Sequence, residues 1–180
     1  KAISATLDGP NFSCLEARMG ELSLCERIWR KVRLTCVKTQ WNNGEIRCDQ
    51  GELDLGEKLP VRFVYRQQSK TLALTLGFPR GETWQLDAQW GQPGWKVRVE
   101  ARNGQVTRLA GFLPQGGVRP TAGTWSGSVS LGGSRTGVES VTADAVYKGL
   151  AFADASGLHA GEKIGGGVRG HASRRKSDWL

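Results

Sequence analysis

The chain has 180 residues, and its 25 Lys and Arg residues against 17 Asp and Glu residues give a formal net charge of +8 at pH 7. This length suits one domain or two small ones, with a real hydrophobic core. The positive excess favours anionic partners such as phospholipid headgroups, although it can also serve solubility alone. The cations are scattered and do not alternate with stacking aromatic residues, so we predict no nucleic-acid partner.

The sequence contains no candidate membrane anchor. No stretch approaches the roughly 18 consecutive apolar residues of a spanning helix, and no secretory signal opens the chain. Lys1 lies in a strand-like run, and Trp179-Leu180 stand where another run begins. We therefore expect a fragment of a longer protein, with any membrane anchor in parts outside this chain.

The cysteines predict an oxidising compartment. They fall in the first third of the chain, without a Cys-x-x-Cys pair or a nearby histidine, so a zinc site is not expected. Of the three possible pairings, the turn sequence Asn42-Asn43-Gly44 favours Cys36 with Cys48, which leaves Cys14 with Cys25 around Met19-Gly20. Four reduced thiols in a cytosolic protein are the alternative.

Alternation of apolar and polar residues with a period of two runs along most of the chain, as in strands with one buried face. Turn sequences separate the runs at 68–69, 79–81, 91–94 and 103–104. We therefore predict an all-β fold, an antiparallel meander that forms a curved, groove-like or partly closed sheet. The apolar positions expected to share its inner face are Phe63, Leu72, Leu74, Leu76, Trp84, Leu86, Val97 and Val99.

One segment breaks the alternation. After Asn103-Gly104, apolar residues recur at helical spacing until Pro114, which predicts one short helix over 105–113. Residues 115–124 read as a loop that could divide the chain. We thus expect a β-meander over 1–114 and glycine-rich strands over 125–180 that continue the same curved sheet. Composition leaves a barrel, a sandwich and an open sheet as alternatives.

Sequence motifs typical of catalytic, metal-binding or dinucleotide-binding sites are weak in this chain. The pattern Gly165-x-Gly167-x-x-Gly170 lacks the following helix that a dinucleotide site needs. Neither His159 nor His171 lies near residues that could form a metal site or a catalytic nucleophile with it. The acidic residues around Glu52 alternate in the sequence, as on the solvent-exposed face of a strand. We predict no enzymatic activity, no catalytic residue, no metal and no cofactor; a carbohydrate-active enzyme ranks last among the alternatives.

The stretch from Gly149 to Glu162, which includes Phe152-Ala153-Asp154, resembles a recurring phrase of the AsmA-like envelope proteins of bacteria, especially the YdbH type. The strand pair Leu34–Leu53 and the 105–114 helix after a strand series resemble parts of the same family. The resemblance implies a β-groove in the periplasm that conducts phospholipid between membranes. It also implies that the chain has no catalytic residues and that other envelope proteins are candidate partners.

The resemblance and the alternation together predict a non-enzymatic lipid-transport module of the cell envelope, with the eight inner-face residues as its groove lining. The alternative is a structural or protein-binding β-sandwich of the envelope, in which the apolar face is a closed core. The two hypotheses differ in whether protein covers that face.

Overall fold

The computed structural model describes residues 3–8, 14–24, 27–112, 118–154, 160–175 and 178–179. In this part of the chain, 13 strands form one antiparallel sheet in which each strand pairs with the next, except that β3 and β4 both pair with β5. The strands are β1 (Ile3–Asp8), β2 (Cys14–Leu24), β3 (Arg27–Cys36), β4 (Thr39–Asn42), β5 (Glu45–Asp54), β6 (Lys58–Arg66), β7 (Thr71–Gly77), β8 (Thr83–Trp90), β9 (Trp95–Gln105), β10 (Arg119–Ser134), β11 (Gly137–Ala153), β12 (Ala160–Arg175) and β13 (Asp178–Trp179).

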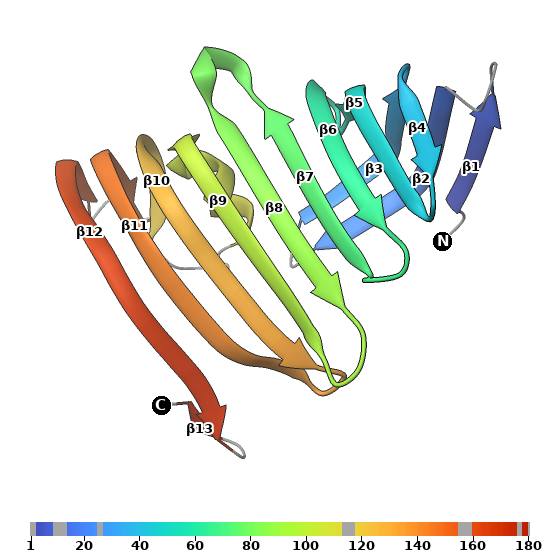
Figure 1. Ribbon diagram of the computed structural model, residues 1–180. Helices are drawn as coiled ribbons and strands as arrows, with labels where there is room; N and C mark the ends of the chain where they lie inside the picture. The colour runs from blue at the N-terminus through green and yellow to red at the C-terminus, as the bar shows by residue number, and fades with distance from the viewer. Residues whose placement is uncertain are drawn as a thin grey trace.

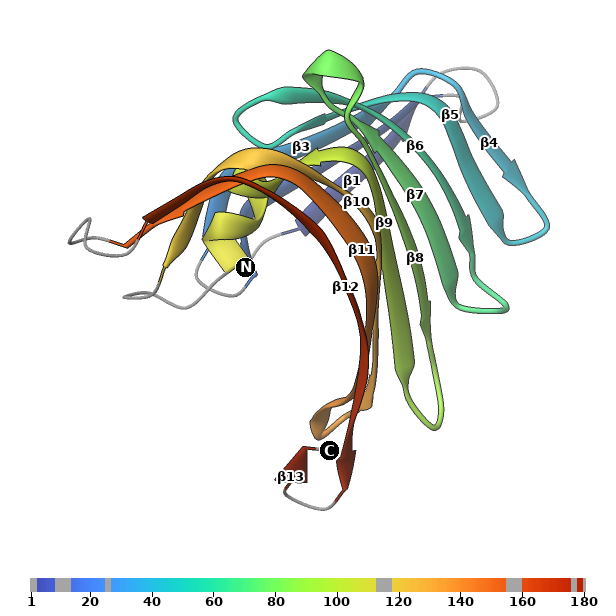
Figure 2. The same ribbon diagram turned by 90° about the vertical axis from the view of Figure 1, so that its left-hand side faces the viewer.

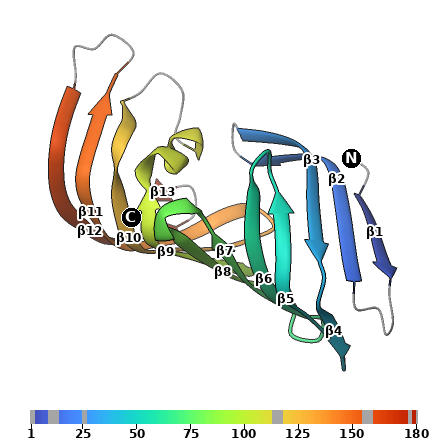
Figure 3. The same cartoon turned by 90° about the horizontal axis from the view of Figure 1, so that it is seen from above.

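The sheet is curved and remains open (Figure 1). Figure 2 shows the strands β10, β11 and β12 arching over the 3-10 helix η3 (Val106–Phe112), which lies on the concave side. Seen from above in Figure 3, β1 to β5 and β9 to β12 form the two walls of a trough, with β7 and β8 at its floor. The prediction of an all-β antiparallel meander with a curved sheet is confirmed.

The short helix is present as η3, although Leu113 lies outside the described residues. The prediction of a turn at Asn103-Gly104 is wrong, because β9 continues through both residues to Gln105. Asn103 has a positive φ of 53°, and the pairing of β9 with β10 shifts register here between Trp125 and Gly127. The left-handed preference of Asn that suggested a turn is thus satisfied in a bulge.

The stretch interpreted as a dividing loop is shorter than expected. β10 begins at Arg119, so the second half of 115–124 belongs to a strand, while 115–117 lie outside the described residues. β9 and β10 pair from Gln105↔Thr124 to Trp95↔Gly133. The strands before and after the expected boundary therefore belong to one sheet.

A disulfide joins Cys36 at the end of β3 to Cys48 in β5, with the two Cα atoms 6.0 Å apart. This part of the cysteine prediction is confirmed. The space for the bridge comes from Gly51, where a Cβ atom would lie 2.8 Å from Cys48 Sγ and 3.0 Å from the Thr35 carbonyl oxygen. Both cysteines are buried and pack against Phe63.

The predicted disulfide between Cys14 and Cys25 is wrong, because Cys14 is a free, exposed cysteine. Cys25 lies outside the described residues. The turn expected at Met19-Gly20 does not form, because β2 runs without interruption from Cys14 to Leu24. An extended strand of this length separates its two ends by about 30 Å, far beyond the reach of a disulfide.

The disulfide leads to a first prediction. Replacement of both Cys36 and Cys48 by Ala should lower the free energy of unfolding by about 3 kcal/mol, because the bridge closes a loop of 12 residues in the unfolded chain. Urea denaturation measures the loss, and peptide mapping without reductant should identify the Cys36–Cys48 link. Cys14→Ser is the matched control, with an expected change within about 0.5 kcal/mol. A double variant as stable as the wild type would contradict the prediction.

Candidate functional site

The strand register aligns the predicted inner-face residues into rows that cross the sheet, because directly paired residues of neighbouring strands share a face. One row runs Phe63↔Leu74↔Leu86↔Val99, a second runs Leu72↔Ala88↔Val97, and a third runs Leu76↔Trp84↔Ala101. β10 and β11 extend the rows through Val129↔Ala143 and Leu131↔Val141. All eight predicted residues thus lie on one face.

These residues are only partly covered. Phe63 is buried at 8% exposure beneath the disulfide cluster, whereas Leu72, Leu74, Leu76, Trp84, Leu86, Val97 and Val99 are half-buried. The described strands belong to one sheet, so no second sheet packs on this face within them. The result is a concave face whose apolar rows remain accessible over β7 to β9.

The opposite face is polar. Its positions include Thr75↔Gln85↔Glu100 and Asp87↔Arg98, which alternate with the apolar rows. A shallow hollow of about 520 Å³ over β7 to β11 is lined mainly by such side chains, among them Asp87, Arg98 and Ser130. The two faces therefore differ sharply in chemistry, as expected for an antiparallel sheet with one wet side.

Helix η3 covers one end of the apolar rows. Buried Val106 and half-buried Leu109 pack with Trp84 and Trp125, whose rings meet edge to face at 5.5 Å. Gly104 makes room for this pair, because a Cβ atom there would lie 2.7 Å from Trp125 Nε1. Tyr147 and Leu150 of β11 complete the cluster. No sequence pattern predicts that these β11 residues pack with the helix.

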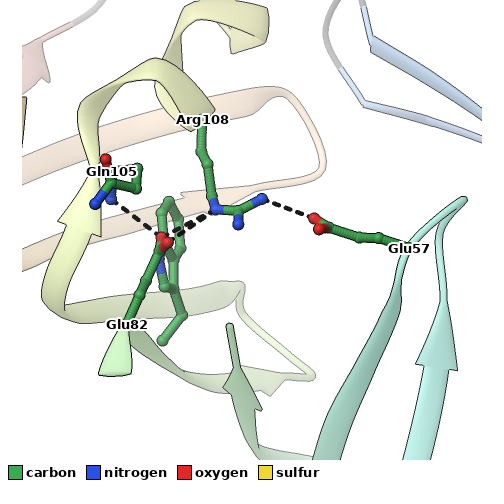
Figure 4. Close-up of polar contacts among 5 residues, drawn as sticks. Glu57, Glu82, Gln105 and Arg108 are labelled. Atoms are coloured by element: carbon green, nitrogen blue, oxygen red, sulfur yellow. Dashed lines mark hydrogen bonds and ion pairs between the residues drawn. The ribbon is translucent and has the colours of Figure 1, made fainter. Parts of the chain in front are cut away.

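A buried carboxylate fixes η3 in place (Figure 4). Glu82 is 1% exposed, and its Oε1 accepts hydrogen bonds from Trp84 Nε1 at 2.6 Å and from the Gln105 backbone N–H at 3.1 Å. Arg108 of η3 donates from Nε to Glu82 at 3.0 Å and from its terminal nitrogen to Glu57 at 2.7 Å. Glu57 lies in the turn between β5 and β6, so this cluster, the Glu82 cluster, joins three parts of the sheet to the helix.

In the Glu82 cluster, the single guanidinium of Arg108 pairs with two carboxylates, those of Glu82 and Glu57. Burial alone would lower the pKa of Arg108, but the hydrogen bonds that its guanidinium donates to Glu82 and Glu57 outweigh burial and hold that pKa above its usual value. The guanidinium carbon also lies 4.0 Å from the centre of the Phe78 ring. Sequence reasoning missed this cluster, because Glu82 stands in an ordinary turn sequence and Arg108 is 26 residues away. Its chemistry is that of a structural clamp, since Arg108 stays protonated.

Within the described ranges, no three His, Cys, Asp or Glu side chains are grouped so that they could hold a metal ion. The helices described here are also too short or too polar to cross a membrane. Comparison of the chain with protein-family models, with curated proteins and with solved structures found no match. The resemblance to AsmA-like proteins therefore stays a prediction.

The Glu82 cluster leads to a second prediction. Arg108→Met should destabilise the fold by about 3 kcal/mol, because it removes the charge partner of a buried carboxylate. Glu82→Gln should cost a similar amount, and the double variant should cost clearly less than the sum, as for two residues of one network. Urea denaturation of the four proteins measures the coupling.

Arg102→Met is the control for this cycle. Arg102 is exposed and its contact with Glu100 is 4.0 Å long, so the loss should stay below about 1 kcal/mol. Strictly additive effects of Arg108→Met and Glu82→Gln would show that the two residues act independently.

A third prediction tests the packing of η3. Leu109→Asp should destabilise the fold by about 3 kcal/mol, because it places an unpaired charge against Trp84 and its neighbours. Thr107→Asp, on the exposed side of the same helix, is the matched control and should change stability by less than about 0.5 kcal/mol. Equal melting temperatures for Leu109→Asp and the wild type would place Leu109 outside the core.

Proposed function

We propose that the chain is a non-enzymatic module of the bacterial cell envelope that binds or conducts phospholipid along the concave apolar face. The observation that carries the proposal is the set of apolar rows, which cross β6 to β11 and stay half-buried from Leu72 to Val99. Water contact with such a surface is unfavourable, and each acyl methylene buried on it contributes about 0.8 kcal/mol.

Two further features support the proposal. The Cys36–Cys48 disulfide agrees with an oxidising compartment such as the periplasm. The net charge of +8 favours the anionic headgroups that accompany the acyl chains. The AsmA-like resemblance of the 149–162 stretch and the Leu34–Leu53 strand pair points to the same compartment and to the same ligand.

The competing function is that of a structural or protein-binding domain. In that case a protein surface, and not an acyl chain, would cover the rows that contain Leu74 and Leu86. A β-sandwich core would need a second sheet, whereas the described strands form one sheet. The apolar face would then need a partner protein of matching shape.

The fourth prediction separates these functions. A photo-crosslinking residue at Leu74 or Leu86 should capture phospholipid in bacterial cells that export the chain to the periplasm. The same residue at Thr75 or Asp87, one position along the same strands, faces the polar side and should capture none. Mass spectrometry of the adducts identifies the captured species.

Three other outcomes would contradict the proposal. Equal lipid labelling from both faces would indicate non-specific adhesion to membranes. Protein adducts from Leu74 and Leu86 would favour the protein-binding alternative. No adducts from either face would remove lipid as the ligand.

A further inference from the structure

The sheet has two unlike margins. Because the strands are antiparallel, alternate turns lie on the same side, and Figure 1 shows the β6–β7, β8–β9 and β10–β11 turns along the lower margin. We call this side, with residues 67–70, 91–94 and 135–136, the turn margin. The opposite margin carries η2 (Pro79–Gly81), η3 and the Glu82 cluster.

Aromatic side chains gather where the concave face meets the turn margin. Tyr65 and Trp90 stack with their ring centres 5.9 Å apart and their planes at 7°. Trp90 is directly paired with Trp95, and Trp41 pairs with Ile46, which in turn pairs with Tyr65. Trp41 and Trp90 are 53% and 41% exposed, so these two rings remain available to a partner.

The structure also forms a hollow at this margin, with a volume of about 810 Å³. Trp90, Trp95, Lys70 and Lys96 contribute to its lining, together with Glu139. Trp95 is held in place, because its Nε1 donates to the Ser134 carbonyl oxygen at 3.0 Å and its ring lies against Gly133, where a Cβ atom would approach it to 2.7 Å. The hollow thus combines fixed indole surface with ammonium groups.

The turn margin carries exposed cations beside its aromatic side chains. Lys70, Lys96 and Arg135 form no ion pair with another residue in the described part of the chain. Glu45 forms ion pairs with Arg47 and Arg66. Glu139, which lines the hollow together with Lys70 and Lys96, accepts a hydrogen bond from the neutral hydroxyl of Ser134. At the helix margin, Arg108 is paired with Glu82 and Glu57, and the exposed Arg119 and Lys148 lie near that margin as well.

We infer that the turn margin docks on the surface of an anionic lipid bilayer. Tryptophan and tyrosine prefer the headgroup level of a membrane, where one side of the ring is wet and the other is apolar. Unpaired lysine and arginine attract the phosphates of the same layer. Docking in this orientation places the bilayer beside the apolar rows at Leu72 and Val97, so an acyl chain reaches them without crossing water. This inference rests on the proposed function, in which the ligand is a phospholipid.

The fifth prediction tests this docking with the full chain and vesicles. In co-sedimentation at about 0.1 M NaCl, the wild type should bind vesicles of phosphatidylcholine with phosphatidylglycerol and should bind pure phosphatidylcholine much more weakly. Lys70→Glu with Lys96→Glu should weaken the binding to anionic vesicles by about thirtyfold or more, since each surface lysine contributes a several-fold attraction. Trp90→Ala should also weaken the binding to anionic vesicles. Its effect relative to the wild type should remain at high salt, where screening removes the contribution of the charges.

Arg119→Glu with Lys148→Glu is the matched control. Both residues are exposed and belong to β10 and β11 near the helix margin, and the pair changes the net charge equally. Nearly wild-type binding by this control, with loss in the Lys70/Lys96 variant, supports docking by the turn margin. Equal losses in both double variants would assign binding to net charge alone and overturn the inference.

A failure of docking differs from a failure of the proposed function. Absence of vesicle binding by the wild type overturns docking even where a photo-crosslinking residue at Leu74 captures phospholipid supplied in micelles. Loss of capture at Leu74, with vesicle binding intact and dependent on Lys70 and Lys96, overturns the lipid-binding face and leaves the docking surface standing.

Discussion

An antiparallel sheet with one apolar face needs a cover for that face, and most of this molecule can be understood from how that need is met. The described part of the chain provides one small cover, the helix η3, over the end of the rows near Trp84 and Trp125. The disulfide and Phe63 provide a second compact cluster under β3, β5 and β6. Between the two clusters the rows through Leu74 and Leu86 remain half-buried. A sheet that is anchored at two places and open between them is suited to hold a flexible apolar ligand.

The parts of the fold that were predictable from the sequence are those that depend on local pattern. Period-two alternation assigns Leu74 and Leu86 to the same face without knowledge of their partners, and short turns at 68–69 and 91–94 bring consecutive strands together. The pairing of Cys36 with Cys48 follows from the same logic, because both flank one turn sequence and alternate onto the apolar side. Local pattern failed at Asn103 and at Met19-Gly20, since residues that favour turns also favour bulges and can lie within a long strand.

Contacts between distant segments were not predictable. The ion pair between Glu82 and Arg108 spans 26 residues, and its second arm to Glu57 spans 51. Nothing in the neighbourhood of Glu82 marks it as buried, because its burial results from the arrival of η3 and from the indole of Trp84. The proposed lipid-facing role of the inner-face residues likewise depends on the fact that the described strands form one sheet, without a second sheet over those residues. No local sequence pattern reports this.

The Glu82 cluster and the turn margin are best understood together. A buried ion pair adds little net stability compared with apolar packing, but it fixes geometry, because each partner is costly to leave unpaired. Here it fixes η3 over the end of the apolar rows near Trp84 and Trp125. The turn margin carries the exposed Trp41 and Trp90, and its Lys70 and Lys96 form no ion pair among the residues that the structure describes. The helix η3 covers one end of the apolar rows, and the tryptophan and lysine side chains at the turn margin match the headgroup layer from which a phospholipid would come in the proposed function.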